Sequence, residues 1–351
     1  MIQTNDLRIA GLRPLIPPEA LKREFPISDD QARFVLEGRK TVENILRKRD
    51  RRMMAIVGPC SIHDPGSALE YTEKLAELAK RIEDRIFVVM RVYFEKPRTT
   101  VGWRGLVVDP DLDGSYDIEK GLKRARELLL EIIGRGLPVG SEMLDPIVPQ
   151  YIADLVSWAA IGARTTESQT HREMASGLSM PVGFKNGTSG NLQLAIDAIK
   201  SSRSSHSFIG IDQQGRTCIL RPTENPDGHM ILRGGRSGPN YHEEYVEEAE
   251  SLFRRDNLEA ALVVDCSHAN CGKDHTKQER VLRSVIDQRV RGRDSIVGFM
   301  LESNIVAGSQ TLAEDGDLAY GCSITDNCLG WDETEEMLLF AHGRLEAVYS
   351  G

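Results

Sequence analysis

The chain has 351 residues, of which 40% are hydrophobic and 28% are charged, a composition typical of globular proteins. Its formal net charge of −9 argues against a nucleic-acid partner, because affinity for nucleic acid depends on Lys and Arg side chains that neutralise phosphates. No apolar run approaches the roughly 18 residues of a membrane span, and the charged segment 1–26 lacks the apolar core of a signal peptide. We therefore expect no membrane partner, a cytoplasmic location and six cysteines that remain thiols.

Residues 1–50 are interpreted as an N-terminal arm. Ser28 and Gln31 have the spacing of a capping box, in which each side chain bonds to the backbone N–H of the other residue. They precede a helix that is predicted to run to about Lys48. We expect this arm to cap one end of the domain formed by residues 51–351, or to contact another subunit.

Residues 51–351 alternate eight short β-branched runs with eight amphipathic stretches. The runs are apolar without strict alternation, as expected of parallel strands that are covered on both faces. This pattern predicts a (β/α)8 TIM barrel rather than a doubly wound open sheet, whose Gly-x-Gly-x-x-Gly fingerprint is missing after the first strand. The predicted strands are 54–57, 86–92, 137–142, 160–164, 181–185, 207–211, 261–266 and 296–301, and the predicted helices are 66–83, 118–134, 149–158, 169–177, 191–201, 241–255, 278–290 and 333–349.

A β-hairpin is predicted to follow the sixth strand, within residues 212–233. Two β-prone runs, 217–221 and 229–232, flank a segment that holds the turn-forming residues Pro222, Asn225, Pro226 and Gly228. The hairpin would be an insertion in the barrel domain.

Basic side chains follow several of the predicted strands. Catalytic groups of a parallel barrel lie at the C-terminal ends of its strands, so these cations should meet on one face. Any one of them could instead be paired with a nearby carboxylate, but several like charges held together are destabilising without an anion. The pattern predicts a small ligand with at least two anionic groups. The six cations are Arg91, Lys96, Arg98, Arg164, Lys185 and Arg233.

Cys60, His268, Glu302 and Asp326 form a second group, because strand eight of a closed barrel lies beside strand one. Alone, a cysteine or histidine in such a place is usually a buried thiol or a hydrogen-bonded structural group. Together the four donors suit one divalent transition-metal ion, without selecting among Mn, Fe, Co, Zn and Cu. The cysteines of the same loops, Cys266, Cys271, Cys322 and Cys328, suggest simple packing, or a disulfide with Cys60 when metal is absent.

Six sequence strings closely resemble the type I 3-deoxy-D-arabino-heptulosonate 7-phosphate (DAHP) synthases. They are GPCSIHD (58–64), RVYFEKPRTT (91–100), GARTTES (162–168), GFKNGT (183–188), ILRGG (231–235) and DCSH (265–268). The resemblance runs nearly end to end and implies a transferase of the shikimate pathway of aromatic amino acid biosynthesis. That enzyme joins phosphoenolpyruvate to D-erythrose 4-phosphate and releases phosphate.

The resemblance also implies roles for individual residues. Lys96, Glu142 and His268 would be catalytic, with Lys96 as a proton donor and Glu142 acting on water. Cys60, His268, Glu302 and Asp326 would bind the metal ion, and Arg98, Thr99 and Asp326 would hold erythrose 4-phosphate. Phosphoenolpyruvate would be bound by Arg91, Lys96, Ala163, Arg164, Lys185 and Arg233. The alternatives are the related 3-deoxy-octulosonate 8-phosphate synthase, which uses arabinose 5-phosphate, and a non-catalytic regulatory barrel.

Feedback inhibition by an aromatic amino acid is a further implication, together with assembly into a homodimer or homotetramer. Gly210 resembles tyrosine-sensitive members, whereas a Ser at this position resembles phenylalanine-sensitive ones; tryptophan-sensitive members also carry Gly. We therefore expect tyrosine to be the effector. The matching positions are Asn5, Asp6, Pro149, Gln150, Leu178, Ser179 and Gly210.

Overall fold

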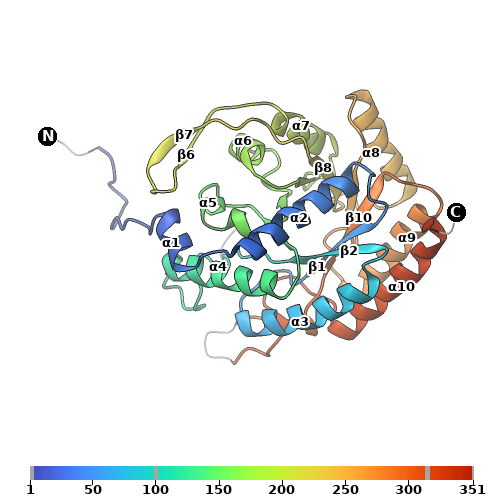
Figure 1. Cartoon of the computed structure of the whole chain (residues 1–351), viewed down its shortest axis with the longest axis horizontal. Helices are drawn as coiled ribbons and strands as arrows, with labels where there is room; N and C mark the ends of the chain where they lie inside the picture. Colours follow the sequence, from blue (N-terminus) through green and yellow to red (C-terminus); the bar gives the residue numbers. More distant parts are fainter. Residues whose placement is uncertain (1–3, 99–101, 313–316, 350–351) are drawn as a thin grey trace.

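A closed barrel of eight parallel strands forms the centre of the computed structural model, which describes residues 4–98, 102–312 and 317–349. The order around the barrel is β1-β10-β9-β8-β5-β4-β3-β2, which confirms the predicted (β/α)8 architecture. Figure 1 shows the helices packed around these strands. The barrel strands are β1 (Met53–Gly58), β2 (Ile86–Arg91), β3 (Val139–Glu142), β4 (Trp158–Ile161), β5 (Val182–Lys185), β8 (Gly228–Leu232), β9 (Leu262–Asp265) and β10 (Ile296–Glu302).

Helices surround the barrel, and most of them match the predicted segments within two residues. They are α3 (Pro65–Ile82), α4 (Ile118–Gly134), α6 (Gln169–Gly177), α7 (Gln193–Ser202), α8 (Glu243–Arg255), α9 (Gln278–Val290) and α10 (Trp331–Tyr349). The helix predicted over 149–158 is wrong in length. It is a single turn, α5 (Pro149–Ile152), followed by the 3-10 turn η1 (Ala153–Leu155), because β4 already begins at Trp158. Another 3-10 turn, η2 (His275–Lys277), precedes α9.

The predicted sixth strand and the position of the hairpin need correction. Segment 207–211 contributes β6 (Phe208–Ile211), which pairs antiparallel with β7 (Thr217–Leu220) outside the barrel. The sixth barrel strand is β8, which pairs parallel with β5 and β9. Burial explains the difference: all five residues of β8 are buried, whereas Ile209 of β6 is 80% exposed. The hairpin therefore precedes the sixth barrel strand.

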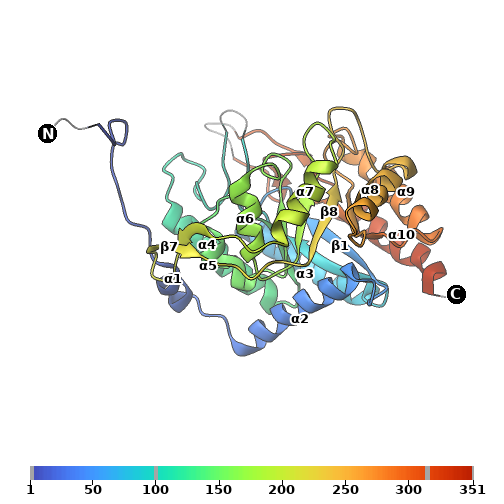
Figure 2. The same cartoon turned by 90° about the horizontal axis from the view of Figure 1, so that it is seen from above.

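The N-terminal arm contains α1 (Pro18–Glu24) and α2 (Asp29–Leu46). The predicted capping box is present, because Ser28 Oγ accepts from the Gln31 backbone N–H and Gln31 Oε1 accepts from that of Ser28. Ile45 of α2 belongs to the apolar cluster that holds Met54 and Val297 inside the barrel, so α2 packs against the N-terminal end of the strands. The segment before α1 leads away from the barrel (Figure 2).

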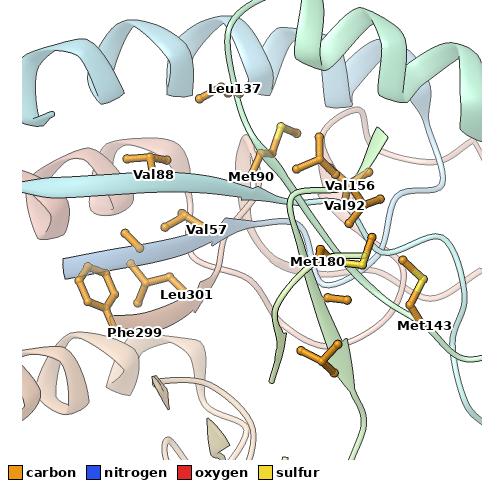
Figure 3. Packing of buried hydrophobic residues seen from close by; sticks show 14 of the residues in the cluster. Val57, Val88, Met90, Val92, Leu137, Met143, Val156, Met180, Phe299 and Leu301 are labelled. Atoms are coloured by element: carbon orange, nitrogen blue, oxygen red, sulfur yellow. The ribbon is translucent and has the colours of Figure 1, made fainter. Parts of the chain in front are cut away.

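Two apolar clusters fill the two sides of the barrel wall. Alternate residues of β1 divide between them: Ala55 and Val57 belong to the cluster that the helices cover, and Ile56 to the one inside the barrel. Figure 3 shows the first cluster between strands and helices, with Val57 and Leu301 on neighbouring strands. The wall that carries the strand ends is thus packed on both sides. No helix in the described ranges is both long and apolar enough to span a membrane.

Candidate functional site

A cavity of about 360 Å³ lies at the C-terminal ends of the barrel strands. All six cations predicted to share one face line it, and so do Glu142, Ala163, His268 and Asp326. Thr188 and Lys273 line it as well, although sequence reasoning assigned them no role; Thr188 stands in the GFKNGT string, and Lys273 follows the DCSH string by five residues. The full lining is Arg91, Lys96, Pro97, Arg98, Glu142, Gly162, Ala163, Arg164, Lys185, Thr188, Arg233, His268, Lys273, Thr325 and Asp326.

Arg91, the last residue of β2, is almost completely buried at the base of this cavity. Its Nη2 donates to Glu302 Oε1 at 2.7 Å, and its guanidinium lies 3.6 Å from the centre of the Tyr93 ring. Its Nη1 is buried and has no hydrogen-bond partner within the described part of the chain. A buried donor without an acceptor is costly, so this N–H is suited to an anion bound in the cavity.

Three arginines of the cavity form no ion pair in the described ranges. Arg98 donates to the backbone carbonyl of Trp103 at 2.8 Å, and Arg164 to that of Pro97 at 3.3 Å. Arg233 donates to the carbonyl of the next residue at 3.2 Å. Carbonyl oxygens orient these guanidinium groups without neutralising them, which leaves their charge available to an anionic ligand.

Glu142, at the end of β3, brings a carboxylate to the same cavity. It is 8% exposed, and its side-chain position requires a glycine at residue 162, because a Cβ on Gly162 would lie 2.2 Å from Glu142 Oε1. Ala163 follows this glycine on the rim. Thr99, which was predicted to hold the sugar phosphate, lies outside the described residues.

Cys60, Glu302 and Asp326 come together beside the cavity, with one ligand atom from each within 4.8 Å of the others. His268 is the fourth predicted ligand, and its Nε2 lies 3.7 Å from Glu302 Oε1. Barrel closure explains this meeting, because Gly58 of β1 is in register with Glu302 of β10. Sulfur, imidazole nitrogen and carboxylate oxygen suit a divalent transition-metal ion, so the residues present fit such an ion.

The electrostatics of this group favour a metal ligand set. Burial tends to raise the pKa of Glu302, but the positive charges of His268 and Arg91 outweigh it and lower the pKa to about 2. Glu302 is therefore ionised at neutral pH. Burial raises the pKa of the Cys60 thiol, so metal binding at this residue would release a proton. The ammonium group of Lys96 donates to Cys60 Sγ at 2.9 Å.

Asp265, the last residue of β9, lies between the two halves of the site, although the sequence suggested no separate role for it. Its Oδ2 lies 2.8 Å from His268 Nδ1 and 3.1 Å from Lys185 Nζ. Burial opposes ionisation, but His268 and Lys185 hold the pKa of Asp265 well below its usual range. His268 Nδ1 also lies 2.7 Å from Ser267 Oγ, whose own hydroxyl donates to Asp265 Oδ1. A proton on Nδ1 therefore faces two oxygen acceptors, which leaves Nε2 of His268 as the metal-facing nitrogen.

The residues predicted to bind the effector do not form a single site in this chain. Pro149 and Gln150 belong to α5, and Gln150 Oε1 accepts from Gln213 in the β6–β7 turn at 2.9 Å. Leu178 and Ser179 instead line a separate cavity of about 430 Å³.

The remaining effector positions lie apart. Gly210 is in β6, opposite Cys218. Asn5 and Asp6 are exposed in a turn at residues 5–8, in the segment that leads away from the barrel (Figure 2).

Comparison with known proteins identifies close relatives along nearly the whole chain. The model of the DAHP synthetase I family matches residues 24–339. The phospho-2-dehydro-3-deoxyheptonate aldolase, Tyr-sensitive, of Escherichia coli K12 is 50% identical over 339 residues, which cover 96% of this chain and 95% of that protein. The Trp-sensitive aldolase of Enterobacter agglomerans is 51% identical over 338 residues, with 96% and 97% covered. A solved structure of the aldolase from Francisella tularensis SCHU S4 has a TM-score of 0.95 at 46% identity, covering 97% of this chain and 99% of that one.

Glu95 is a buried carboxyl group in the loop that carries Lys96. It is 5% exposed, and its Oε2 accepts a long bond of 3.5 Å from the backbone N–H of Asp145. Burial, reinforced by the charge of Asp145, raises the pKa of Glu95 from 4.5 to about 8. A folded-state pKa above the unfolded value means that stability is complete below pH 4.5 and is lost as the pH rises through 8.

We therefore expect Glu95→Gln to stabilise the protein progressively between pH 4.5 and pH 8, because glutamine never has to ionise in the buried loop. Urea unfolding should show a gain on the order of a few kcal/mol at pH 8.5 and almost none at pH 5. Glu37→Gln, at an exposed position, is the control and should change the unfolding free energy by less than about 0.5 kcal/mol. Equal effects of Glu95→Gln at both pH values would contradict the raised pKa.

Proposed function

This chain belongs to the DAHP synthetase I family, and we propose that it condenses phosphoenolpyruvate with D-erythrose 4-phosphate to give DAHP and phosphate. The observation that carries this proposal is one cavity in which six Lys and Arg side chains adjoin the Cys60, Glu302 and Asp326 group. The two substrates together carry two phosphates and a carboxylate, which several cations are needed to bind. The aldehyde of the sugar also needs a Lewis acid beside it to polarise its oxygen. We also propose a cytoplasmic location, where the six cysteines, each a free thiol in this structure, would stay reduced.

Phosphoenolpyruvate carries a carboxylate and a phosphate, which are the groups that guanidinium forks bind in bidentate fashion. Among the residues that the structure describes, Arg91 has a buried N–H without an acceptor, and Arg164 and Arg233 form no ion pair. Lys185 and the backbone at Ala163 line the same cavity. We assign these residues and Lys96 to phosphoenolpyruvate, and Arg98, Thr99 and Asp326 to erythrose 4-phosphate.

Carbon–carbon bond formation requires C3 of phosphoenolpyruvate to face the aldehyde carbon of the sugar. Holding both substrates in one cavity makes this step effectively unimolecular, and positioning of this kind can contribute about 7–11 kcal/mol. A divalent ion held by Cys60, His268, Glu302 and Asp326 would supply Lewis-acid polarisation of the aldehyde oxygen. Lys96 lies beside this group and would donate the proton that the new alkoxide needs.

Attack through C3 leaves positive charge on C2 of the former phosphoenolpyruvate, and water adds there. Glu142 lines the cavity and is the carboxylate that we assign to orient and deprotonate this water. The hemiketal phosphate then loses inorganic phosphate and leaves the keto group of the product. Phosphate release therefore reports the complete reaction.

Regulation by an aromatic amino acid is part of the same proposal, with tyrosine as the effector. A Cβ on Gly210 would lie 2.5 Å from Leu220 Cδ1, so this position admits no side chain unless Leu220 moves. The arm that holds Asn5 and Asp6 exposes Leu7 and Leu12, with 69% and 85% exposure. Exposed leucines of this kind support assembly into a homodimer or homotetramer, in which the arm would meet the effector region of another copy.

The expected activity is tested with metal-stripped protein and each metal ion added back. Phosphoenolpyruvate and erythrose 4-phosphate should yield phosphate only when a divalent ion is present, because the aldehyde must be polarised. Arabinose 5-phosphate is the matched control. Turnover of that sugar instead would identify the octulosonate enzyme, and no phosphate release with either sugar would indicate a non-catalytic barrel.

Glu142→Gln should lower kcat by at least about 100-fold, because general acid–base catalysis by one group typically contributes 100-fold or more. Steady-state kinetics with metal content measured in parallel provides the test. Glu167→Gln, at an exposed glutamate outside the cavity lining, is the control and should keep kcat. Unchanged turnover of metal-loaded Glu142→Gln would remove Glu142 from the role of base.

Tyrosine should inhibit phosphate release more strongly than phenylalanine or tryptophan, because Gly210 resembles the residue at this position in tyrosine-sensitive members of the family. The measurement is the concentration of each amino acid that halves the rate at fixed substrate. Gly210→Ser should shift the preference toward phenylalanine while preserving the uninhibited rate. Insensitivity to all three amino acids would overturn the assignment of the effector site.

A further inference from the structure

Both oxygens of the buried Asp265 carboxylate contact two hydrogen-bond donors each within the site. Oδ2 is shared by His268 Nδ1 at 2.8 Å and Lys185 Nζ at 3.1 Å. Oδ1 accepts from the backbone N–H of Ser267 at 3.0 Å and from its hydroxyl at 2.8 Å. Asp265 is 1% exposed and does not line the cavity, so this carboxylate reaches ligands only through the groups it holds.

The two groups that share Oδ2 belong to different halves of the site. Lys185 ends β5 and lines the cavity among the cations. His268 follows β9 with a left-handed φ of 54°, and its other nitrogen lies 3.7 Å from Glu302 Oε1. A φ in this region is unfavourable for a residue other than glycine, so contacts must hold His268 in this orientation.

We propose that Asp265 is a positioning residue that couples the anion-binding and metal-binding halves of the site. Its carboxylate holds Lys185 in place for the anionic substrate and, together with the Ser267 hydroxyl that it orients, fixes the histidine tautomer whose Nε2 is available to the metal ion. This inference rests on the proposed function for the identity of the substrate. It adds that the two binding events depend on one shared oxygen atom.

Asp265→Asn is a sharp probe, because an amide cannot satisfy these four donors. Whichever way the amide turns, its NH₂ group faces either the Lys185 and His268 pair or the backbone N–H of Ser267. In the first orientation, the Lys185 ammonium loses its acceptor, and the imidazole keeps only the Ser267 hydroxyl, which lies 2.7 Å from Nδ1. In the second, a buried N–H loses its own.

The experiment compares Asp265→Asn with wild type by calorimetry, using Mn²⁺ alone and phosphoenolpyruvate alone on metal-free protein. We expect Mn²⁺ affinity to fall about 10- to 100-fold, the usual effect of removing the partner of a metal-binding histidine. Phosphoenolpyruvate affinity should fall at least about 10-fold as Lys185 loses its anchor.

Asp154→Asn is the matched control, because Asp154 also pairs with a buried cation, Arg126 at 2.8 Å, but lies outside the cavity lining. It should reduce thermal stability and leave both affinities unchanged.

The double variant Asp265→Asn with Lys185→Met removes both buried charges and guards against misfolding of the single variant. In the Lys185→Met background, Asp265→Asn should weaken Mn²⁺ binding and add no further loss of phosphoenolpyruvate affinity.

Wild-type affinities in folded Asp265→Asn, or equal losses in Asp154→Asn, would overturn the coupling role. A further loss of phosphoenolpyruvate affinity in the double variant would also overturn it, because the effect would then not pass through Lys185. The proposed function fails separately, if the wild-type protein neither binds phosphoenolpyruvate nor releases phosphate from it. Weaker binding of both Mn²⁺ and phosphoenolpyruvate in Asp265→Asn, with unchanged binding in Asp154→Asn, supports the inference.

Discussion

The pairing of β1 with β10 is the constraint on which the site depends. Because Gly58 is in register with Glu302, the loop that carries Cys60 lies beside a carboxylate that is more than 200 residues away in the sequence. An open sheet would leave these two strands at opposite edges. Barrel closure therefore creates the candidate metal group, and the packed clusters on both sides of the wall keep its geometry rigid.

Charge balance is the second consequence of this closure. Like charges held together in a partly buried cavity repel one another, and three of the six cations contact a side chain of the metal group or the shared carboxylate of Asp265. Arg91 contacts Glu302, Lys96 contacts Cys60, and Lys185 contacts Asp265. The remaining three arginines bond only to backbone carbonyls among the described contacts and keep an unneutralised charge. The cavity thus keeps positive charge that is available to an anion.

Sequence periodicity predicted seven of the eight barrel strands and failed at the sixth. The run 207–211 and the run 229–232 are both short, β-prone and bounded by turn residues, so local pattern does not distinguish them. Only burial does, because β8 is covered on both faces while β6 exposes Ile209. The same limit applies to Asp265, whose role depends on neighbours from β5 and the loop after β9.

The sequence by itself determined the barrel, the cationic face and the donor set of the candidate metal site, because strand ends in a parallel barrel must point the same way. It also carried the family resemblance, which the comparisons confirm. Only the tertiary structure decided which cations are paired, which are left for an anion, and which carboxylate joins the two halves. Those outcomes depend on distances of a few ångströms between side chains from different strands, and spacing along one chain does not encode them.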